Sequence, residues 1–113
     1  MLIDFSTLEE QKIPHFRNGE KVTTIRMFTD PLGKVMSGSL EPGASIGMHT
    51  HGTSSEVIYI LSGDGKVICD GETEIVHAGS CHFCPKGMTG ASVSTLECHL
   101  HIWFLSLSPG PAG

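Results

Sequence analysis

Short apolar segments, each ended by glycine or proline, run along most of the chain. One of them, Val57-Ile58-Tyr59-Ile60, consists of β-branched and aromatic residues that favour strands. No window of 11 or more residues keeps the spacing of an amphipathic helix, and only one helical turn is expected, at residues 6–11 with Ser6 as its cap. The pattern predicts about nine strands, at residues 22–28, 34–40, 44–51, 56–61, 66–69, 72–76, 80–84, 91–94 and 96–107.

Turn signals separate these predicted strands. Asp30-Pro31-Leu32-Gly33 is a turn sequence between the first two, and Asp70-Gly71 is the strongest two-residue hairpin signal in the chain. About nine short strands joined by tight turns are typical of a sandwich or a barrel. We therefore expect an all-β fold.

Size and charge narrow the function classes. A chain of 113 residues is expected to form one domain with a small core, and 39% apolar with 17% charged residues suits a globular protein. The net charge of -5 gives no electrostatic reason to expect nucleic acid or an anionic membrane as a partner. No apolar run reaches the length of a signal peptide or a membrane span. We expect a cytoplasmic protein that contacts no membrane.

The cysteines are expected to be free thiols. Cys81 and Cys84 form a C-x-x-C, but no second pair completes a zinc site. On a strand, residues three apart face opposite sides and lie about 10 Å apart along it. A disulfide needs Cα atoms within about 7 Å, so this spacing argues against one between Cys81 and Cys84.

Residues 43–63 carry the strongest chemical signal. His49 and His51 alternate, so they project from one face if the segment is extended. A bend over residues 52–55 would return the chain and bring Glu56 beside them. Two imidazoles and a carboxylate converging on one point bind a divalent transition metal, and this ligand set accepts iron, manganese, nickel or zinc.

The same segment matches a family motif. The first motif of the cupins is glycine, five residues, His-x-His, three or four residues, Glu, six residues and glycine; Gly43, His49, His51, Glu56 and Gly63 stand at those spacings. Over residues 35–105 the chain thus resembles a small single-domain cupin. The resemblance implies a jelly-roll barrel, also called a double-stranded β-helix, with the metal inside it.

The resemblance also implies an organisation. We expect an N-terminal segment at residues 1–34, a cupin barrel at 35–107 and a flexible tail at 108–113. Strands of small cupins often cross to a second subunit, so the resemblance implies a homodimer to which the N-terminal segment contributes.

The second cupin motif is only partly present. Gly79, Pro85 and Gly87 match its turn, but Gly90 stands where the family has its fourth ligand, a histidine, and Ser94 where it has asparagine. One outcome is a three-ligand site with open positions for water or substrate. In the other outcome, a different histidine replaces the missing ligand.

Three histidines are candidates for that replacement. His99 and His101 share a face of the last predicted strand, which in a jelly roll lies beside the strand of Glu56. His82 precedes the second-motif turn. For His99 and His101 the alternative is that they form a polar face exposed to solvent.

These features predict a small metal-binding cupin. An enzyme of this kind would use the metal on a small carboxylate, a sugar acid or a phenolic compound, as a dioxygenase, isomerase, lyase or decarboxylase; the family contains all four, so the fold selects none. The alternatives are a non-catalytic module that binds or senses a small molecule, and a degenerate barrel without metal. No serine-nucleophile elbow or phosphate-binding loop competes with these predictions.

Overall fold

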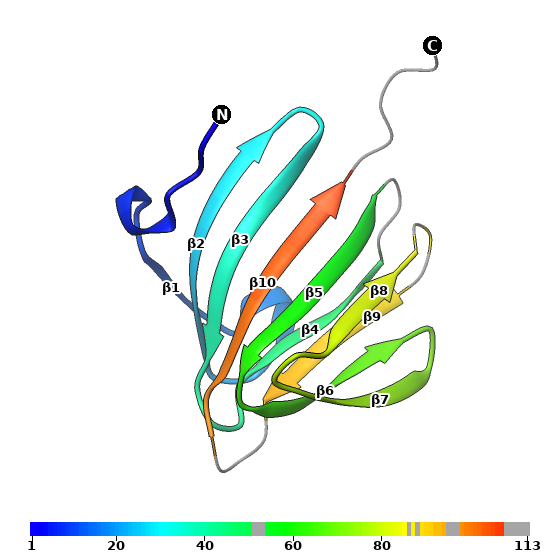
Figure 1. Cartoon of the computed structure of the whole chain (residues 1–113). Helices are drawn as coiled ribbons and strands as arrows, with labels where there is room; N and C mark the ends of the chain where they lie inside the picture. The colour runs from blue at the N-terminus through cyan, green and yellow to red at the C-terminus, as the bar shows by residue number, and fades with distance from the viewer. Residues whose placement is uncertain (51–53, 86, 88, 95–97, 108–113) are drawn as a thin grey trace.

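The computed structural model describes residues 1–50, 54–85, 87, 89–94 and 98–107. These residues form two short 3₁₀ helices and ten strands (Figure 1). In chain order, the elements are η1 (Phe5–Thr7), β1 (Gln11–Pro14), η2 (Phe16–Asn18), β2 (Val22–Asp30), β3 (Gly33–Leu40), β4 (Ser45–Thr50), β5 (Ser55–Ser62), β6 (Asp64–Cys69), β7 (Glu72–His77), β8 (Cys81–Cys84), β9 (Thr89–Ser94) and β10 (Leu100–Leu107).

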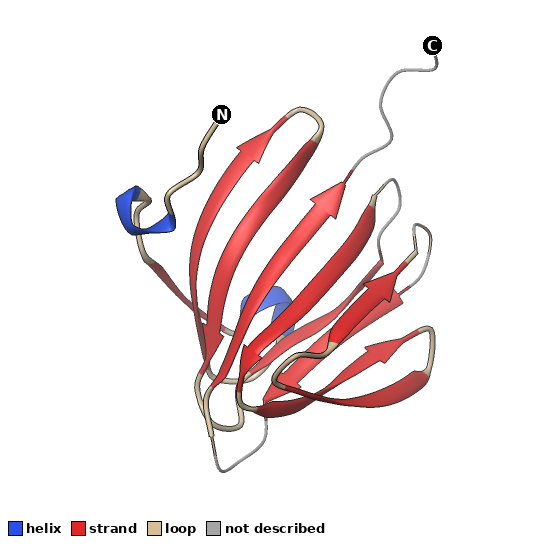
Figure 2. Cartoon of the chain, in the orientation of Figure 1, coloured by secondary structure: helices blue, strands red, loops and turns tan. Residues whose placement is uncertain are grey.

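The strands form two antiparallel sheets that face each other. One sheet has the order β1-β2-β3-β10-β5-β8 and the other the order β4-β9-β6-β7. Figure 2 shows the larger sheet in front, with strands of the smaller one behind it. The predicted all-β jelly roll is confirmed. No helix among the described residues is long and apolar enough to span a membrane.

The expected strands are present, with differences at both ends of the chain. The predicted helical turn is instead η1, and Asp4 rather than Ser6 caps it, accepting a hydrogen bond from the Ser6 backbone N–H at 3.0 Å. Hydrogen bonds from the Ser6 hydroxyl and N–H lower the pKa of Asp4. The short edge strand β1 was not expected, because only Ile13 in it has a strong strand preference. Strand β10 begins at Leu100; residues 95–97 and the tail lie outside the described part.

The predicted hairpin turns form for the expected reasons. Asp70 and Gly71 both have positive φ, of 51° and 84°, as the type I′ turn between β6 and β7 requires. Between β2 and β3, the Asp30 carboxylate accepts a hydrogen bond from the Leu32 backbone N–H at 2.7 Å. Each turn fixes the register of the two strands that it joins.

Strand register arranges the inward-facing residues of the larger sheet in rows. Residues directly opposite each other share a face of the sheet, and one such row joins Ile25, Gly38, Ile102 and Ile60. Ile60 and Ile102 have no exposed surface. A parallel row one step away contains Leu40 and Leu100, also fully buried. These rows are the apolar core of the barrel. The full core cluster is Leu40, Ala44, Ile46, Ile58, Ile60, Val67, Val76, Leu100 and Ile102.

Strand β4 is held by the segment around η2. The Ser45 backbone N–H donates to the Glu20 carbonyl at 2.9 Å, and the Glu20 N–H donates to the Ser45 hydroxyl at 2.7 Å. Gly19 and Gly47 let the two backbones approach closely, since a Cβ on Gly47 would lie 2.1 Å from the Arg17 carbonyl oxygen. The N-terminal segment thus fixes the strand that leads to His49.

Candidate metal centre

Glu56 is a buried carboxylate at one end of the barrel. It lies on β5, where Glu56, Ile58 and Ile60 alternate on the inner face, and only 7% of it is exposed. Its neighbours across the sheet are Cys84 on β8 and Ser106 on β10. Burying a carboxylate is costly unless it is paired or bound to a metal. The position of Glu56 therefore differs in polarity from the apolar rows of Ile60 and Leu100.

The backbone of His49 belongs to a row on the opposite sheet. In that row His49 on β4 pairs with Gly90 on β9, and Gly90 pairs with Cys69 on β6. The Cys69 and Cys84 sulfurs lie 2.9 Å apart. Because Cys84 is opposite Glu56, this contact joins the row of His49 to the row of Glu56 at one level of the barrel.

The structure describes only part of the predicted ligand set, which stays a prediction. It places Glu56 and the backbone of His49 at the same end, while His51 and the side chain of His49 lie outside the described part. Strand β4 ends and β5 begins at this end, as the predicted bend requires. Among the described residues alone, no group of three or more His, Cys, Asp or Glu side chains is arranged to hold a metal.

His82 faces the barrel interior near Glu56. It lies on β8 opposite Ile58, two residues along from the Cys84–Glu56 pair. Only 6% of His82 is exposed, and its buried Nδ1 atom has no hydrogen-bond partner among the described residues. Buried polar atoms are almost always paired. This atom is therefore available to a group that enters the barrel, and the residues present fit a bound metal or ligand here.

His99 and His101 do not line the barrel. Both side chains are exposed, with their rings stacked at 6.1 Å between centroids. The neighbours of His101 on β10, Leu100 and Ile102, face inward, so His101 points outward. Strand β10 lies beside β5 as expected, but the alternation puts these histidines on the wrong face to replace the missing ligand. Their solvent-exposed alternative is the correct one.

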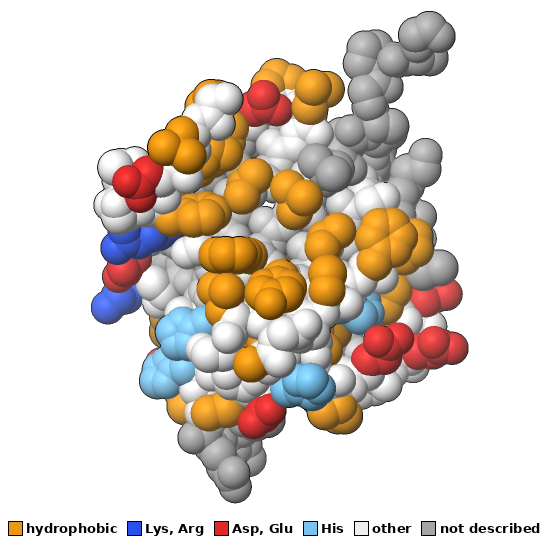
Figure 3. All heavy atoms as spheres, in the orientation of Figure 1, with side chains coloured by type: hydrophobic (Ala, Val, Ile, Leu, Met, Phe, Trp, Pro, Cys, Tyr) orange, Lys and Arg blue, Asp and Glu red, His pale blue; other side chains and the backbone are white. Residues whose placement is uncertain are grey.

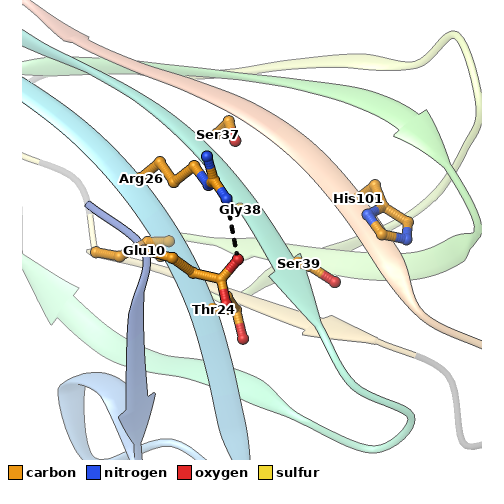
Figure 4. Close-up of a pocket in the computed structure, with 8 residues that line it drawn as sticks. Glu10, Thr24, Arg26, Ser37, Gly38, Ser39 and His101 are labelled. Atoms are coloured by element: carbon orange, nitrogen blue, oxygen red, sulfur yellow. Dashed lines mark hydrogen bonds and ion pairs between the residues drawn. The ribbon is translucent and has the colours of Figure 1, made fainter. Parts of the chain in front are cut away.

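His101 instead borders a groove of about 130 Å³ on the outer face of the larger sheet (Figure 4). Across this groove Arg26 on β2 forms an ion pair with Glu10 at 3.2 Å. Arg26 also donates a hydrogen bond to the Phe5 carbonyl at 3.1 Å. These contacts attach the N-terminal segment to the outside of the sheet, away from Glu56.

The cysteines differ in environment as the strand geometry predicts for Cys81 and Cys84. Cys81 is exposed on the outer face and Cys84 is buried on the inner face, and no cysteine is in a disulfide. Burial raises the pKa of the Cys84 thiol to about 12, and its hydrogen bond with Cys69 is the next cause. No sequence pattern indicates the Cys69–Cys84 contact, because it depends on how the two sheets close.

Comparisons with known proteins agree with this architecture. The family model described as "Cupin domain" matches residues 37–90. Over these residues the chain matches a cupin domain. No protein of curated function matches its sequence.

Solved structures with the same fold include several cupins. A predicted oxalate decarboxylase from Thermotoga maritima has a TM-score of 0.87 and 21% identity, covering 96% of this chain and 100% of its own. An RmlC-like cupin from Shewanella frigidimarina has a TM-score of 0.77 and 20% identity, covering 96% and 90%. The polyketide cyclase RemF from Streptomyces resistomycificus has a TM-score of 0.75 and 20% identity, covering 99% and 82%. At these identities the likeness shows the cupin fold and no shared activity.

Proposed function

We propose that this cupin domain binds a divalent transition metal through His49, His51 and Glu56, at the end of the barrel where Glu56 is buried. The observation that supports this most is the register. It brings the row of His49 and the row of Glu56 to one level, although the two residues lie on different sheets. Neutral imidazoles and an ionised carboxylate suit iron, manganese, nickel or zinc.

We propose that the bound metal acts on a small carboxylate, a sugar acid or a phenolic compound. When bound, a metal of this kind polarises an oxygen of the ligand as a Lewis acid. The chain itself supplies the surroundings: Ile58 and Ile60 exclude water from one side, and the His82 imidazole has a free ring nitrogen for the ligand or the metal. Two proteins of the same fold are named as a predicted oxalate decarboxylase and a polyketide cyclase. Decarboxylation is one of the reactions that we expect for this site.

Metal analysis of purified protein tests the site. The wild-type protein and an Asp64→Asn variant, altered at an exposed carboxylate, should carry equal metal by elemental analysis. The His49→Ala, His51→Ala double variant should carry none, because two of three ligands are gone. Equal metal in the double variant would reject the assignment.

A second candidate function is binding or sensing of a small molecule without catalysis. Gly90 in place of the usual fourth ligand favours it. Turnover of a panel of small carboxylates and phenolic compounds by protein loaded with iron or manganese separates the two functions. If no compound is turned over while one still raises Tm, the binding function is the correct one.

We also propose that two copies associate through the outer face of the larger sheet. Its exposed apolar side chains are Tyr59, Leu61, Phe83 and Trp103, with exposures of 38%, 40%, 58% and 49%. Figure 3 shows hydrophobic side chains gathered over this face, and the Tyr59 and Trp103 rings lie 5.9 Å apart. The four residues lie on β10, β5 and β8, which are neighbours in the larger sheet. A standard interface buries about 800 Å² per partner, so the adjoining strands β3 and β2 would take part in it as well.

Light scattering after gel filtration tests the dimer. The wild type should have twice the chain mass of 12.1 kDa, and Trp103→Asp should be a folded monomer. The matched control is Ile75→Asp, which changes an exposed residue of the smaller sheet and should remain a dimer. A monomeric wild type would contradict the proposal.

We also propose that the protein is cytoplasmic. None of its four cysteines is in a disulfide, which suits a reducing compartment.

A further inference from the structure

Cys69 and Cys84 lie on different sheets but are in direct contact. Cys69 is the last residue of β6 in the smaller sheet, and Cys84 is the last residue of β8 in the larger one. Their sulfurs are 2.9 Å apart, and either thiol could donate a hydrogen bond to the other. The sulfurs of a disulfide are about 2.05 Å apart, so bond formation needs an approach of roughly 1 Å.

The two thiols differ in access. Cys84 is 3% exposed, whereas Cys69 is partly exposed. A small oxidant from solvent therefore reaches Cys69 first, and Cys84 is already positioned behind it. One reachable thiol with a second thiol in contact is the arrangement of a peroxide-oxidised cysteine and its resolving partner.

From this geometry we propose that Cys69 and Cys84 form a reversible disulfide that joins the two sheets, with hydrogen peroxide as the oxidant. In the first step the Cys69 sulfur attacks one peroxide oxygen, which gives the sulfenic acid and one water. In the second step the Cys84 sulfur attacks the Cys69 sulfur, and the sulfenic oxygen leaves with the Cys84 proton as a second water. The two sulfurs lose two electrons in total, and one peroxide is reduced to two waters.

The bond would change the protein in a defined way. It would join β6 of the smaller sheet to β8 of the larger sheet, beside Glu56. It would close a loop of about 15 residues in the unfolded chain, and a cross-link of that length raises Tm by roughly 10 °C. The proposal does not depend on metal binding, because neither cysteine belongs to the proposed ligand set.

The experiment needs a variant of the protein in which Cys69 can pair with only one nearby cysteine. Cys69, Cys81 and Cys84 fall between Lys66 and Lys86, so trypsin leaves them in one peptide. Cleavage after Glu72 and Glu74 separates Cys69 from the other two. A Cys81→Ser variant of the full chain, altered at an exposed residue, then makes Cys84 the only partner in that region.

Reduced, folded Cys81→Ser protein is treated with hydrogen peroxide, alkylated and digested with a Glu-specific protease. We expect the loss of two alkylatable thiols, a mass decrease of two hydrogen atoms and a peptide that links Cys69 to Cys84. Tm should rise, and a dithiol reductant should reverse both changes. Cys69→Ser and Cys84→Ser should each abolish the linked peptide and the Tm rise.

Three outcomes would overturn the proposal. Peroxide could leave both thiols alkylatable, oxidise Cys69 to the sulfinic acid without a link, or link Cys69 to Cys98 instead. If Cys84→Ser does not fold, the linked peptide in the Cys81→Ser and Cys69→Ser proteins decides the matter. The same oxidation in denaturant shows whether the pairing depends on the native fold, as we expect.

Discussion

The interior of the barrel has two regions that follow from the same strand alternation. In the rows of Ile60 and Leu100, the inward positions are fully buried aliphatic side chains. In the row of Glu56, the inward positions are a carboxylate, the Cys84 thiol and the Ser106 hydroxyl, with His82 one step away. An apolar interior would be more stable than one with buried polar groups. Under the proposed function, the first region stabilises the fold and the second binds the metal.

The largest expected effect comes from the apolar region. Leu100→Ala should reduce the free energy of unfolding by about 3–4 kcal/mol, because it removes a fully buried side chain and leaves a cavity. Leu32→Ala, at a side chain that is 55% exposed, should change it by less than about 0.5 kcal/mol. Urea denaturation measures both. Metal content per folded molecule should stay the same, and its loss in Leu100→Ala would remove the distinction between the regions.

In the polar region, Glu56→Gln should change binding rather than folding. The amide has nearly the same shape but no charge, so we expect metal affinity to fall by at least about 100-fold. Without metal, the free energy of unfolding should not decrease by more than about 1 kcal/mol, since a buried charge is removed. The control is Glu74→Gln, at an exposed site on β7. Titration calorimetry with Mn²⁺ gives both affinities, and equal values would contradict the account.

His82→Leu should show which role the buried imidazole has. If Nδ1 binds the metal, metal affinity should fall by about 10- to 100-fold. If it contacts the bound molecule instead, metal affinity should be unchanged while affinity for the small molecule falls. His101→Leu, on the outer face, is the control. In either case the metal-free variant should be at least as stable as the wild type, because the substitution removes an unpaired buried nitrogen. A clear loss of stability would show that His82 belongs to the structural region.

Metal affinity should depend on pH in one direction. Imidazoles bind metal in the neutral form, and the ordinary pKa of histidine is about 6.5. Affinity should therefore be full above about pH 7 and fall as the pH decreases below about 6, by up to about tenfold per unit for each protonated ligand. Competition titrations between pH 5 and 8 measure this slope. A flat profile would contradict histidine ligation.

Much of the fold could be predicted from local sequence. The strand-favouring residues at Val57–Ile60 and the Asp70-Gly71 turn are local signals, and both agree with the structure. The spacing of the first motif indicated the cupin fold, whereas the end of the barrel at which Glu56 lies came from the strand register. Strand β1 was missed, because its pairing with β2 rather than its composition makes it a strand.

The rest of the site depends on contacts between residues that are distant in the chain. Nothing near His82 or Cys69 in the sequence shows that their side chains face the barrel interior beside Glu56. The inward direction of His82 follows from the register of β8 on β5, and the Cys69–Cys84 contact from the closure of the two sheets. His101 is exposed because its neighbours Leu100 and Ile102 take the inward positions of β10.

A crystal structure with anomalous data collected at the metal absorption edges tests the central claim most directly. The account predicts one anomalous peak inside the barrel, with a Glu56 carboxylate oxygen and the imidazoles of His49 and His51 at about 2.0–2.2 Å from it. A barrel interior without such a peak in crystals grown with Mn²⁺ or Fe²⁺, or a peak bound by other residues, would contradict it.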